Sequence, residues 1–380
     1  MFSITRYVCL FVGLALVNDA AQHTELWLQC FEQTWATIRE RHFDKTLGGL
    51  DWDAAGKTAK EAVASAKSEE QARKAIGEML QRLGHSHVGL IPREVFDAEG
   101  KGSGWLGMET RKIEGKRVVW RVAPGSPAAQ AGVKPGWILD GPAPSRGEVG
   151  QETELSFLPG GKLRLRFAQA RGRLAAFGNL PPIPIDIEFR KIGDVGYFRL
   201  SAFFEPDWIQ SEMAQAVAAC RDCKGFVVDL RGNPGGIGML SAALAGWFLE
   251  EAAVMGTVKF RDYELKLTAN PRVEGFGGKL AVLVDRQSMS TSEFFAGAIQ
   301  DWGRGRIFGE VSAGMALPST VEKLPNGDAL QYTTASYVSA SGRALEGKGV
   351  IPDVEIPLRQ ADLLAGRDAV LAAALEWIHG

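Results

Sequence analysis

The sequence predicts an α/β protein of several domains, because its 380 residues fall into three stretches with different patterns. Apolar residues recur at helical spacing in residues 24–82, turn motifs and alternating residues follow from about residue 100, and apolar strands alternate with helices from about residue 176. A chain of this length exceeds one ordinary domain. We therefore expect a helical domain, a small β domain, an α/β core and a C-terminal helix, at residues 22–97, 98–175, 176–358 and 359–380.

Residues 1–21 have the pattern of an export signal. Arg6 precedes an apolar run of eleven residues, Tyr7 to Val17, which is too short to span a bilayer and typical of a signal-peptide core. Asn18 and Asp19 stand where a cleavage site prefers small residues. We expect export to the periplasm or the extracellular space, with membrane association only through this segment; a buried N-terminal helix is the alternative.

Residues 24–82 predict the helical domain. Leu28, Phe31, Trp35 and Ile38 recur at helical spacing, and the stretch from Glu69 to Leu83 continues this pattern. Two consecutive glycines at 48 and 49 separate the helices, because glycine is a strong helix breaker.

Composition indicates a globular protein with no nucleic-acid partner. Apolar residues make up 46% of the chain and charged residues 23%, and the net charge of −2 offers no attraction to nucleic acid or to an anionic membrane. The single pair Cys220 and Cys223 cannot supply the four ligands of a structural zinc site. We expect both thiols to be structural, with a local disulfide after export as the alternative, and we expect no metal site.

The second stretch resembles a PDZ domain over about residues 103–172. It carries Ala123-Pro-Gly-Ser-Pro127, then Gly132 and Gly136, which predict a turn, a short helix and another turn. The resemblance implies that the loop of Leu106, Gly107 and Met108 captures a peptide by strand addition. Trp137 stands where such domains usually have aspartate, and an unrelated small β domain is the alternative.

Two junctions in the α/β core place chemistry-bearing residues after buried strands. The loop Asp229-Leu-Arg-Gly-Asn-Pro-Gly-Gly236 has glycines that let backbone N–H groups approach a bound oxygen; a plain turn is the alternative. The segment Ser288-Met-Ser-Thr-Ser-Glu293 leads from a strand into a helix, where N–H groups are unpaired. Ser290 is therefore either a helix cap paired with Glu293 or an acyl-transfer nucleophile.

Together, these motifs and the intervening PDZ-like stretch resemble the tail-specific (C-terminal-processing) serine peptidases, where they occur in the same order. The resemblance implies a ClpP/crotonase-like α/β core, protein or peptide substrates and no cofactor. It also implies that Ser290 is the nucleophile. The oxyanion hole would consist of the backbone N–H of Gly235 or Gly236 and that of Thr291.

The general base departs from the common pattern of the family. Many members use a lysine in a Gly-Lys-Gly segment after the serine, but Met315 occupies that position here. A thioether cannot accept the serine proton, so another residue must act as the base.

The tricorn-like branch of the family uses histidine, and this chain has matching residues. His87 aligns with the catalytic histidine, Ser86 with an auxiliary serine, and Glu346 with the glutamate that orients the histidine. A carboxylate in that position would fix the imidazole tautomer. The alternatives are a two-ligand metal site or a strand pair formed by His85 and His87, and Lys348 as a replacement base.

We therefore predict an exported endopeptidase or C-terminal-processing peptidase that uses Ser290, His87, Glu346 and Ser86. One alternative is a catalytically inactive peptide- or ligand-binding protein on the same fold, because folds can lose their chemistry while they retain binding. The other is an esterase-like hydrolase with the same catalytic residues. The sequence predicts no oligomeric state.

Overall fold

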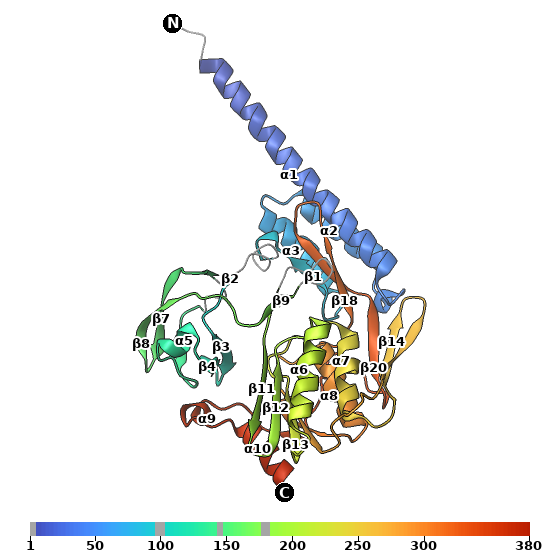
Figure 1. Ribbon diagram of the computed structural model, residues 1–380. Helices are drawn as coiled ribbons and strands as arrows, with labels where there is room; N and C mark the ends of the chain where they lie inside the picture. Colours follow the sequence, from blue (N-terminus) through green and yellow to red (C-terminus); the bar gives the residue numbers. More distant parts are fainter. Residues whose placement is uncertain (1–4, 96–102, 143–146, 176–182) are drawn as a thin grey trace. The chain divides into compact units, whose positions relative to one another are not determined.

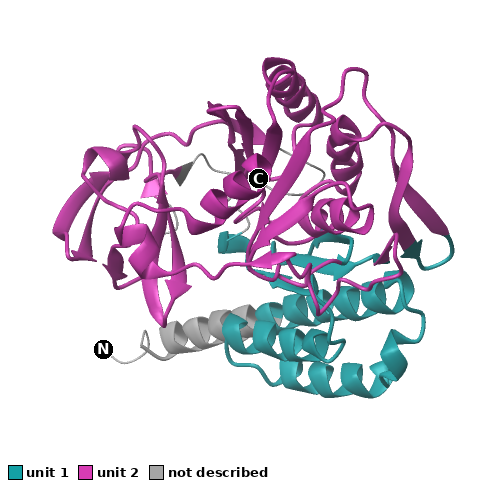
Figure 2. Cartoon of the chain, turned by 90° about the horizontal axis from the view of Figure 1, so that it is seen from below, with its two compact units in different colours: residues 1–96, 259–263, 317–336 teal, residues 97–258, 264–316, 337–380 magenta. Residues whose placement is uncertain are grey.

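The computed structural model describes residues 5–95, 103–142, 147–175 and 183–380, with residues 5–21 as backbone only. The chain forms two compact units (Figure 1, Figure 2). Unit 1 consists of residues 1–96, 259–263 and 317–336, and unit 2 consists of residues 97–258, 264–316 and 337–380. The mixture of helices and sheets confirms the predicted α/β class.

Helices form most of unit 1. They are α1 (Thr5–Arg41), the 3-10 turn η1 (Leu47–Gly49), α2 (Trp52–Ala64) and α3 (Glu69–Gln81). Asp51 and Ser68 cap α2 and α3, because each side chain accepts a hydrogen bond from the backbone N–H three residues later. The helices share one apolar core, which includes Trp27, Phe31, Ile38, Ile76 and Leu80. The predicted N-terminal helical region is confirmed.

The predicted export signal lies partly outside the described residues, because the structure describes none of residues 1–4. The rest of the predicted signal, from Thr5 onwards, is the first part of helix α1. Among the residues that the structure describes, no helix has both the length and the apolarity needed to cross a membrane.

A small antiparallel sheet completes unit 1 and joins distant parts of the sequence. Its strands are β1 (Gly89–Ile91), β19 (Ala329–Thr333) and β18 (Ser319–Lys323), in the order β1-β19-β18. Leu330 and Tyr332 pack into the core of the helices. The buried Asp328 accepts hydrogen bonds from the Arg73 guanidinium and from the Arg93 backbone N–H. Asp328 thus links α3 to the segment that follows β1.

A six-stranded sheet forms the centre of unit 2 (Figure 1). Its strand order is β11-β12-β13-β16-β17-β21, antiparallel at β11 and parallel elsewhere. The bounds are β11 (Ile187–Ile192), β12 (Val195–Leu200), β13 (Gly225–Asp229), β16 (Lys279–Val284), β17 (Arg306–Gly309) and β21 (Val354–Glu355). Parallel strands place their carboxyl ends at one edge, where the Asp229 loop and the Ser290 turn both begin.

Alternating side chains bury both faces of this sheet. Phe226 and Val228 face a core that contains residues of α6 (Pro206–Ala219), α7 (Gly238–Ala245) and α8 (Thr291–Asp301), whereas Val227 faces α10 (Ala369–His379). Full burial of each such side chain contributes about 1.5–3 kcal/mol to stability. Burial on both faces explains why these strands are continuous apolar runs in the sequence.

The small β domain predicted within residues 98–175 contains a five-stranded antiparallel sheet in the order β3-β4-β5-β7-β8. The strands are β3 (Met108–Ile113), β4 (Lys116–Val122), β5 (Ile138–Asp140), β7 (Glu152–Leu158) and β8 (Gly161–Arg166). The short helix α5 (Pro127–Gln130) packs on it, with Ala128, Val119 and Phe157 in a shared core. The predicted turn, short helix and turn are present.

The remaining elements are short. Three two- or three-stranded sheets pair β2 (Ser103–Gly104) with β6 (Gly147–Glu148), β9 (Arg173–Ala175) with β10 (Ile183–Ile185), and β14 (Ala253–Phe260) with β15 (Glu264–Ala269) and β20 (Ala335–Ser339). The turn η2 (Gly246–Phe248) and helix α9 (Gln360–Leu364) complete unit 2. Most of the predicted proline-rich linker, at residues 176–182, lies outside the described residues. Cys220 and Cys223 are buried free thiols, and burial raises the pKa of Cys220 to about 12.

Candidate active site

Ser290 occupies a tight corner between β16 and α8 in unit 2. Its backbone has a φ of 56° and a ψ of −117°, a conformation that costs a non-glycine residue about 1–3 kcal/mol. A strained strand-to-helix turn of this kind exposes the side chain at the edge of the sheet. Ser290 is the N-cap residue of α8 and forms a capping box with Glu293, whose carboxylate accepts from the Ser290 N–H. A capping hydroxyl acts as an acceptor, so its own proton is still available to a base.

The carboxylate of the fully buried Glu293 forms hydrogen bonds with the backbone of this corner. One carboxylate oxygen accepts hydrogen bonds from the backbone N–H groups of Ser290 and Met315, at 3.0 Å each. The other accepts from the Ser312 hydroxyl at 2.6 Å and from the Gly314 N–H at 2.7 Å. Burial raises the pKa of Glu293, against the effect of these donors. The carboxylate thus ties the serine turn to the segment that carries Met315.

The glycine-rich loop packs directly against Ser290. A Cβ atom at Gly235 would lie 2.7 Å from the Ser290 Cβ and 2.9 Å from the Thr291 backbone nitrogen. The Asn233 carbonyl accepts hydrogen bonds from the Met289 N–H and the Ser292 hydroxyl, at 3.1 Å each. Only glycine at position 235 permits this approach of the two backbones.

Two backbone donors beside Ser290 are unpaired. The Gly235 N–H donates to Asn233 Oδ1 at 2.8 Å and is therefore occupied. The N–H groups of Gly236 and Thr291 donate to no residue within the described part of unit 2. The Thr291 hydroxyl donates to the Gly236 carbonyl at 2.8 Å, which links the start of α8 to the glycine-rich loop. Such a pair of donors is suited to bind an oxyanion.

Glu346 lies next to the segment of Met315. Its Oε2 accepts a hydrogen bond from the Ala316 N–H at 2.8 Å, while the Met315 carbonyl accepts from the Ser290 N–H at 2.9 Å. A short backbone path therefore connects the serine and the glutamate within unit 2. Lys348, the alternative base, has an exposed side chain.

His87 and Ser86 lie in unit 1, immediately before β1. The Ser86 hydroxyl and His87 Nδ1 share a hydrogen bond of 2.8 Å. The backbone of His87 has a φ of 57°, which is uncommon for a non-glycine residue and frequent at functional sites. The side chain is half-buried and is not part of the apolar core of the helices.

A second pair of histidines holds the same loop. His42 is fully buried, and its Nε2 lies 3.2 Å from His85 Nδ1, with the two rings stacked at 5.2 Å. His42 Nδ1 lies 3.2 Å from the Asp44 N–H nitrogen and 3.3 Å from the Asp44 carbonyl oxygen, so the His42 ring is held from both sides. Burial lowers the pKa of His42, which favours its neutral form. His85 is thus hydrogen-bonded to a buried residue of unit 1.

The PDZ-like loop presents unpaired backbone donors of its own. The carbonyls of Leu106 and Gly107 accept hydrogen bonds from Ala128 and Ala123, both at about 2.9 Å or less. The N–H groups of Leu106 and Gly107 donate to no described residue. Met108 begins β3 and is half-buried. A sheet edge with such donors can accept an extended peptide.

Arg111 links the PDZ-like sheet to the core of unit 2. Its guanidinium forms a buried ion pair with Asp285, at the end of β16, and lies 3.9 Å from the Trp120 ring centroid. Asp285 in turn accepts hydrogen bonds from the N–H groups of Gly232 and Ser288. Asp285 therefore joins the glycine-rich loop, the serine turn and the PDZ-like sheet.

Four of these residues are absent from the sequence-based prediction of the site: Arg111, Asn233, Asp285 and, in its wider role, Glu293. The spacing of Glu293 predicts a helix cap, but nothing in the local sequence indicates its bonds to Gly314 and Met315. Asn233 belongs to the glycine-rich motif and could have been found there.

Two family models match the chain. The model of peptidase family S41 matches residues 194–356, and the model of the tricorn protease C1 domain matches residues 23–81. Among known proteins, a carboxyl-terminal-processing protease from Synechocystis sp. is 27% identical over 92% of this chain and 86% of its own length. A probable CtpA-like serine protease from Staphylococcus aureus is 26% identical over 76% of this chain, which covers only 60% of that protein.

Solved structures show the same fold. The photosystem II D1 C-terminal processing protease aligns with a TM-score of 0.60 and 23% identity, over 87% of this chain and 93% of that one. The tricorn protease aligns with a TM-score of 0.59 and 18% identity, over 94% of this chain and 37% of that one. Residues 194–356 thus match peptidase family S41, residues 23–81 match the tricorn protease C1 domain, and the chain is similar to carboxyl-terminal-processing proteases, which agrees with the predicted resemblance to the tail-specific serine peptidases.

Proposed function

We propose that this protein hydrolyses peptide bonds in extended or C-terminal protein segments through a Ser290–His87–Glu346 triad assisted by Ser86. The observation that carries the proposal is the environment of Ser290. It stands on a strained strand-to-helix turn, and the N–H groups of Gly236 and Thr291 beside it have no partner within the described part of unit 2. A lysine base is excluded at position 315 by the methionine there.

In this mechanism, His87 accepts the proton of the Ser290 hydroxyl while Oγ attacks the carbonyl carbon of the substrate. The N–H groups of Gly236 and Thr291 stabilise the oxyanion, and removal of one such donor typically costs about 3–4 kcal/mol of barrier. His87 then protonates the leaving amine, and a water molecule hydrolyses the acyl-enzyme. In this mechanism Nδ1 carries the ring proton and donates it to the Ser86 hydroxyl, so that Nε2 is free to accept, and the Glu346 carboxylate stabilises the imidazolium that forms.

The PDZ-like loop would capture the substrate chain. Its free N–H groups and the edge of β3 suit an extended peptide, and capture would raise the concentration of that peptide near Ser290. The N-terminal segment supports export as the cellular setting. Peptide capture and export concern how the protein meets its substrate, and either could be wrong without affecting the proposed catalytic residues.

Cleavage of a fluorogenic peptide tests the proposal. The peptide should be used with a free carboxyl terminus and with an amidated one. We expect the wild-type protein to cleave the free form faster, and Ser290→Ala, His87→Ala and Glu346→Gln to lose at least about a hundredfold in rate. Lys348→Met is the matched control and should retain activity.

Binding of the peptide without cleavage would contradict the proposal and favour the inactive binding protein. Cleavage of a small acyl ester, with no cleavage of any peptide, would favour the esterase-like alternative. Equal rates on the free and amidated peptides would refute capture of the chain end but not the triad.

A further inference from the structure

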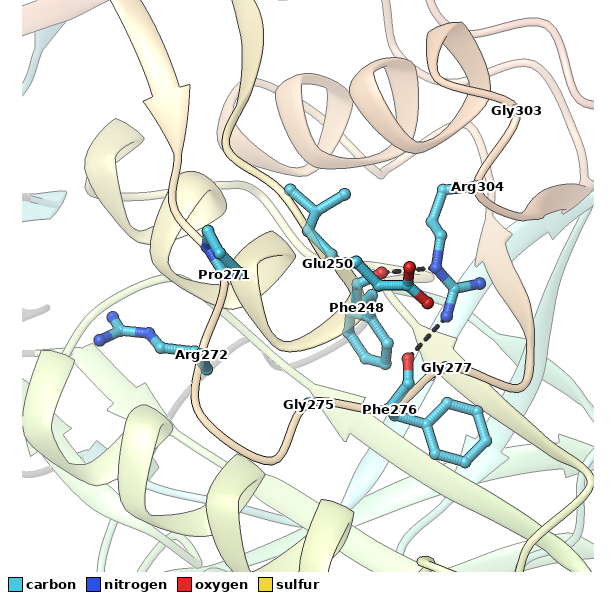
Figure 3. A pocket seen from close by; sticks show the side chains of 10 residues that line it. Phe248, Glu250, Pro271, Arg272, Gly275, Phe276, Gly277, Gly303 and Arg304 are labelled. Atoms are coloured by element: carbon cyan, nitrogen blue, oxygen red, sulfur yellow. Dashed lines mark hydrogen bonds between the residues drawn. The ribbon is translucent and has the colours of Figure 1, made fainter.

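Unit 2 contains a cavity that the catalytic proposal does not use. It has a volume of about 640 Å³, within the range of about 300–1,000 Å³ that is typical of small-molecule sites (Figure 3). Its walls include Phe248, Glu250, Gly275, Phe276 and Arg304. The stretch Gly275–Gly277 precedes β16, and Arg304 precedes β17, so the cavity borders the amino ends of these strands. The Ser290 turn lies beyond the carboxyl end of β16, about 20 Å away along that strand.

Arg304 is fixed in the wall of this cavity. Its Nε donates to the Phe248 carbonyl at 2.5 Å, and its Nη2 donates to the Phe276 carbonyl at 2.7 Å (Figure 3). These bonds hold the guanidinium plane and leave Nη1 without a partner among the described residues. A guanidinium held in this way loses little further entropy when it binds a carboxylate.

Arg304 also lacks a counter-ion. It is half-buried, and no carboxylate of the described residues forms an ion pair with it. Burial lowers the pKa of its guanidinium, and Glu250 opposes this shift only through its charge. The Phe248 ring beneath it is packed against Phe226, at a centroid distance of 5.6 Å, so this wall of the cavity is rigid.

Glu250 provides the opposite charge in the same cavity (Figure 3). Its side chain is exposed, and it forms no ion pair with another residue that the structure describes. The cavity therefore presents a positive and a negative group that do not neutralise each other by contact. A ligand with one group of each charge would satisfy both.

From these features, we propose that the cavity binds a zwitterion whose carboxylate pairs with Arg304 and whose ammonium group pairs with Glu250. The ligand class is a free α-amino acid or a short unblocked peptide. The second arginine in the wall, Arg272, makes the lining more positive than negative, which favours the carboxylate end. Because the cavity is remote from Ser290, binding here is independent of the triad.

Isothermal titration calorimetry with end-blocked probes tests the proposal on the full chain. The probes are L-leucine, N-acetyl-L-leucine, L-leucinamide and trialanine. We expect L-leucine or trialanine to bind wild-type protein at least about tenfold more tightly than either blocked leucine. Tighter binding of L-leucine would identify a free amino acid as the preferred ligand, and tighter binding of trialanine would identify a short peptide.

Two variants assign each end of the ligand. Glu250→Gln should remove the preference for leucine over N-acetyl-leucine, and Arg304→Gln should remove the preference for leucine over leucinamide. Glu251→Gln, at the exposed neighbouring position outside the cavity, and Arg164→Gln, on β8, are the matched controls and should bind like the wild type. Comparing blocked and unblocked probes within one variant cancels any change in its folded fraction.

Ser290→Ala should bind all four probes like the wild type, which separates this proposal from the peptidase proposal. Absence of binding by both unblocked probes would overturn it. Binding that Glu250→Gln and Arg304→Gln leave unchanged would also overturn it, because such binding would occur at another surface.

Discussion

Replacement of Glu293 should weaken both the fold and the reactivity of Ser290, and by different amounts for glutamine and alanine. In Glu293→Gln, the amide oxygen can still accept from the N–H groups of Ser290 and Met315. The amide nitrogen can donate to Ser312 Oγ, which can reverse its role, but it leaves the Gly314 N–H buried and unpaired. One orphaned donor costs about 1–3 kcal/mol.

Glu293→Ala removes all four acceptor bonds. Ser290 retains its bond to the Met315 carbonyl, so two buried N–H groups, those of Gly314 and Met315, lose their only partner. The free energy of unfolding should therefore fall by about 2–6 kcal/mol, roughly twice the effect of Glu293→Gln. Urea unfolding followed by tryptophan fluorescence measures the stability, and the rate of fluorophosphonate labelling measures the reactivity of the serine.

Fluorophosphonate labelling of Ser290 should be slower in both variants than in the wild type, because the Glu293 carboxylate holds the strained Ser290 backbone in place. The effect should be larger in Glu293→Ala than in Glu293→Gln. An alanine variant with wild-type stability would refute the hydrogen-bond account of Glu293. A labelling rate that remains at the wild-type value, despite the expected loss of stability, would refute its role in positioning Ser290.

Three further predictions concern the surroundings of the site. Burial opposes ionisation of Asp229, but the charge of Arg231 outweighs burial and lowers the pKa of Asp229 to about 2. The ion pair therefore stabilises the fold above pH ~4, and about 2 kcal/mol of this stability should be lost as the pH falls towards 2. Asp229→Asn should not show this loss in an acid-unfolding titration. Gly236→Ala should be strongly destabilised in thermal unfolding and should react poorly with the fluorophosphonate, since its Cβ would lie 2.3 Å from a backbone carbonyl oxygen at a φ of 143°. Gly238→Ala is the control: its Cβ would have no contact closer than 3.7 Å, and the variant should unfold like the wild type. Arg111→Met should cost about 3–5 kcal/mol, because Asp285 loses its buried partner; an unchanged urea midpoint would show that the ion pair is unimportant.

The sequence was sufficient for the fold class and for the residues that belong to local motifs. Apolar strands that end at Asp229 and Val284 predict the parallel sheet, because residues buried on both faces leave continuous apolar runs. The Ser290 junction is visible for the same reason, since it immediately follows such a strand.

Contacts between distant segments were not predictable in this way. Strand β19 pairs with β1, which lies more than two hundred residues earlier in the chain, and no local pattern specifies that partner. Likewise, both Gly235 and Gly236 suit an oxyanion hole by residue type. Only the Asn233 side chain, by occupying the Gly235 N–H, leaves Gly236 as the available donor.

The identity of the nucleophile and its base is the central claim, and mapping a covalent adduct tests it most directly. Wild-type protein, His87→Ala and Lys348→Met should each be treated with a fluorophosphonate probe, digested, and examined by mass spectrometry for the modified serine. We predict an adduct on Ser290 in the wild type and in Lys348→Met, and labelling at least about a hundredfold slower in His87→Ala. An adduct on Ser288 or Ser292, or undiminished labelling of Ser290 in His87→Ala, would contradict the account.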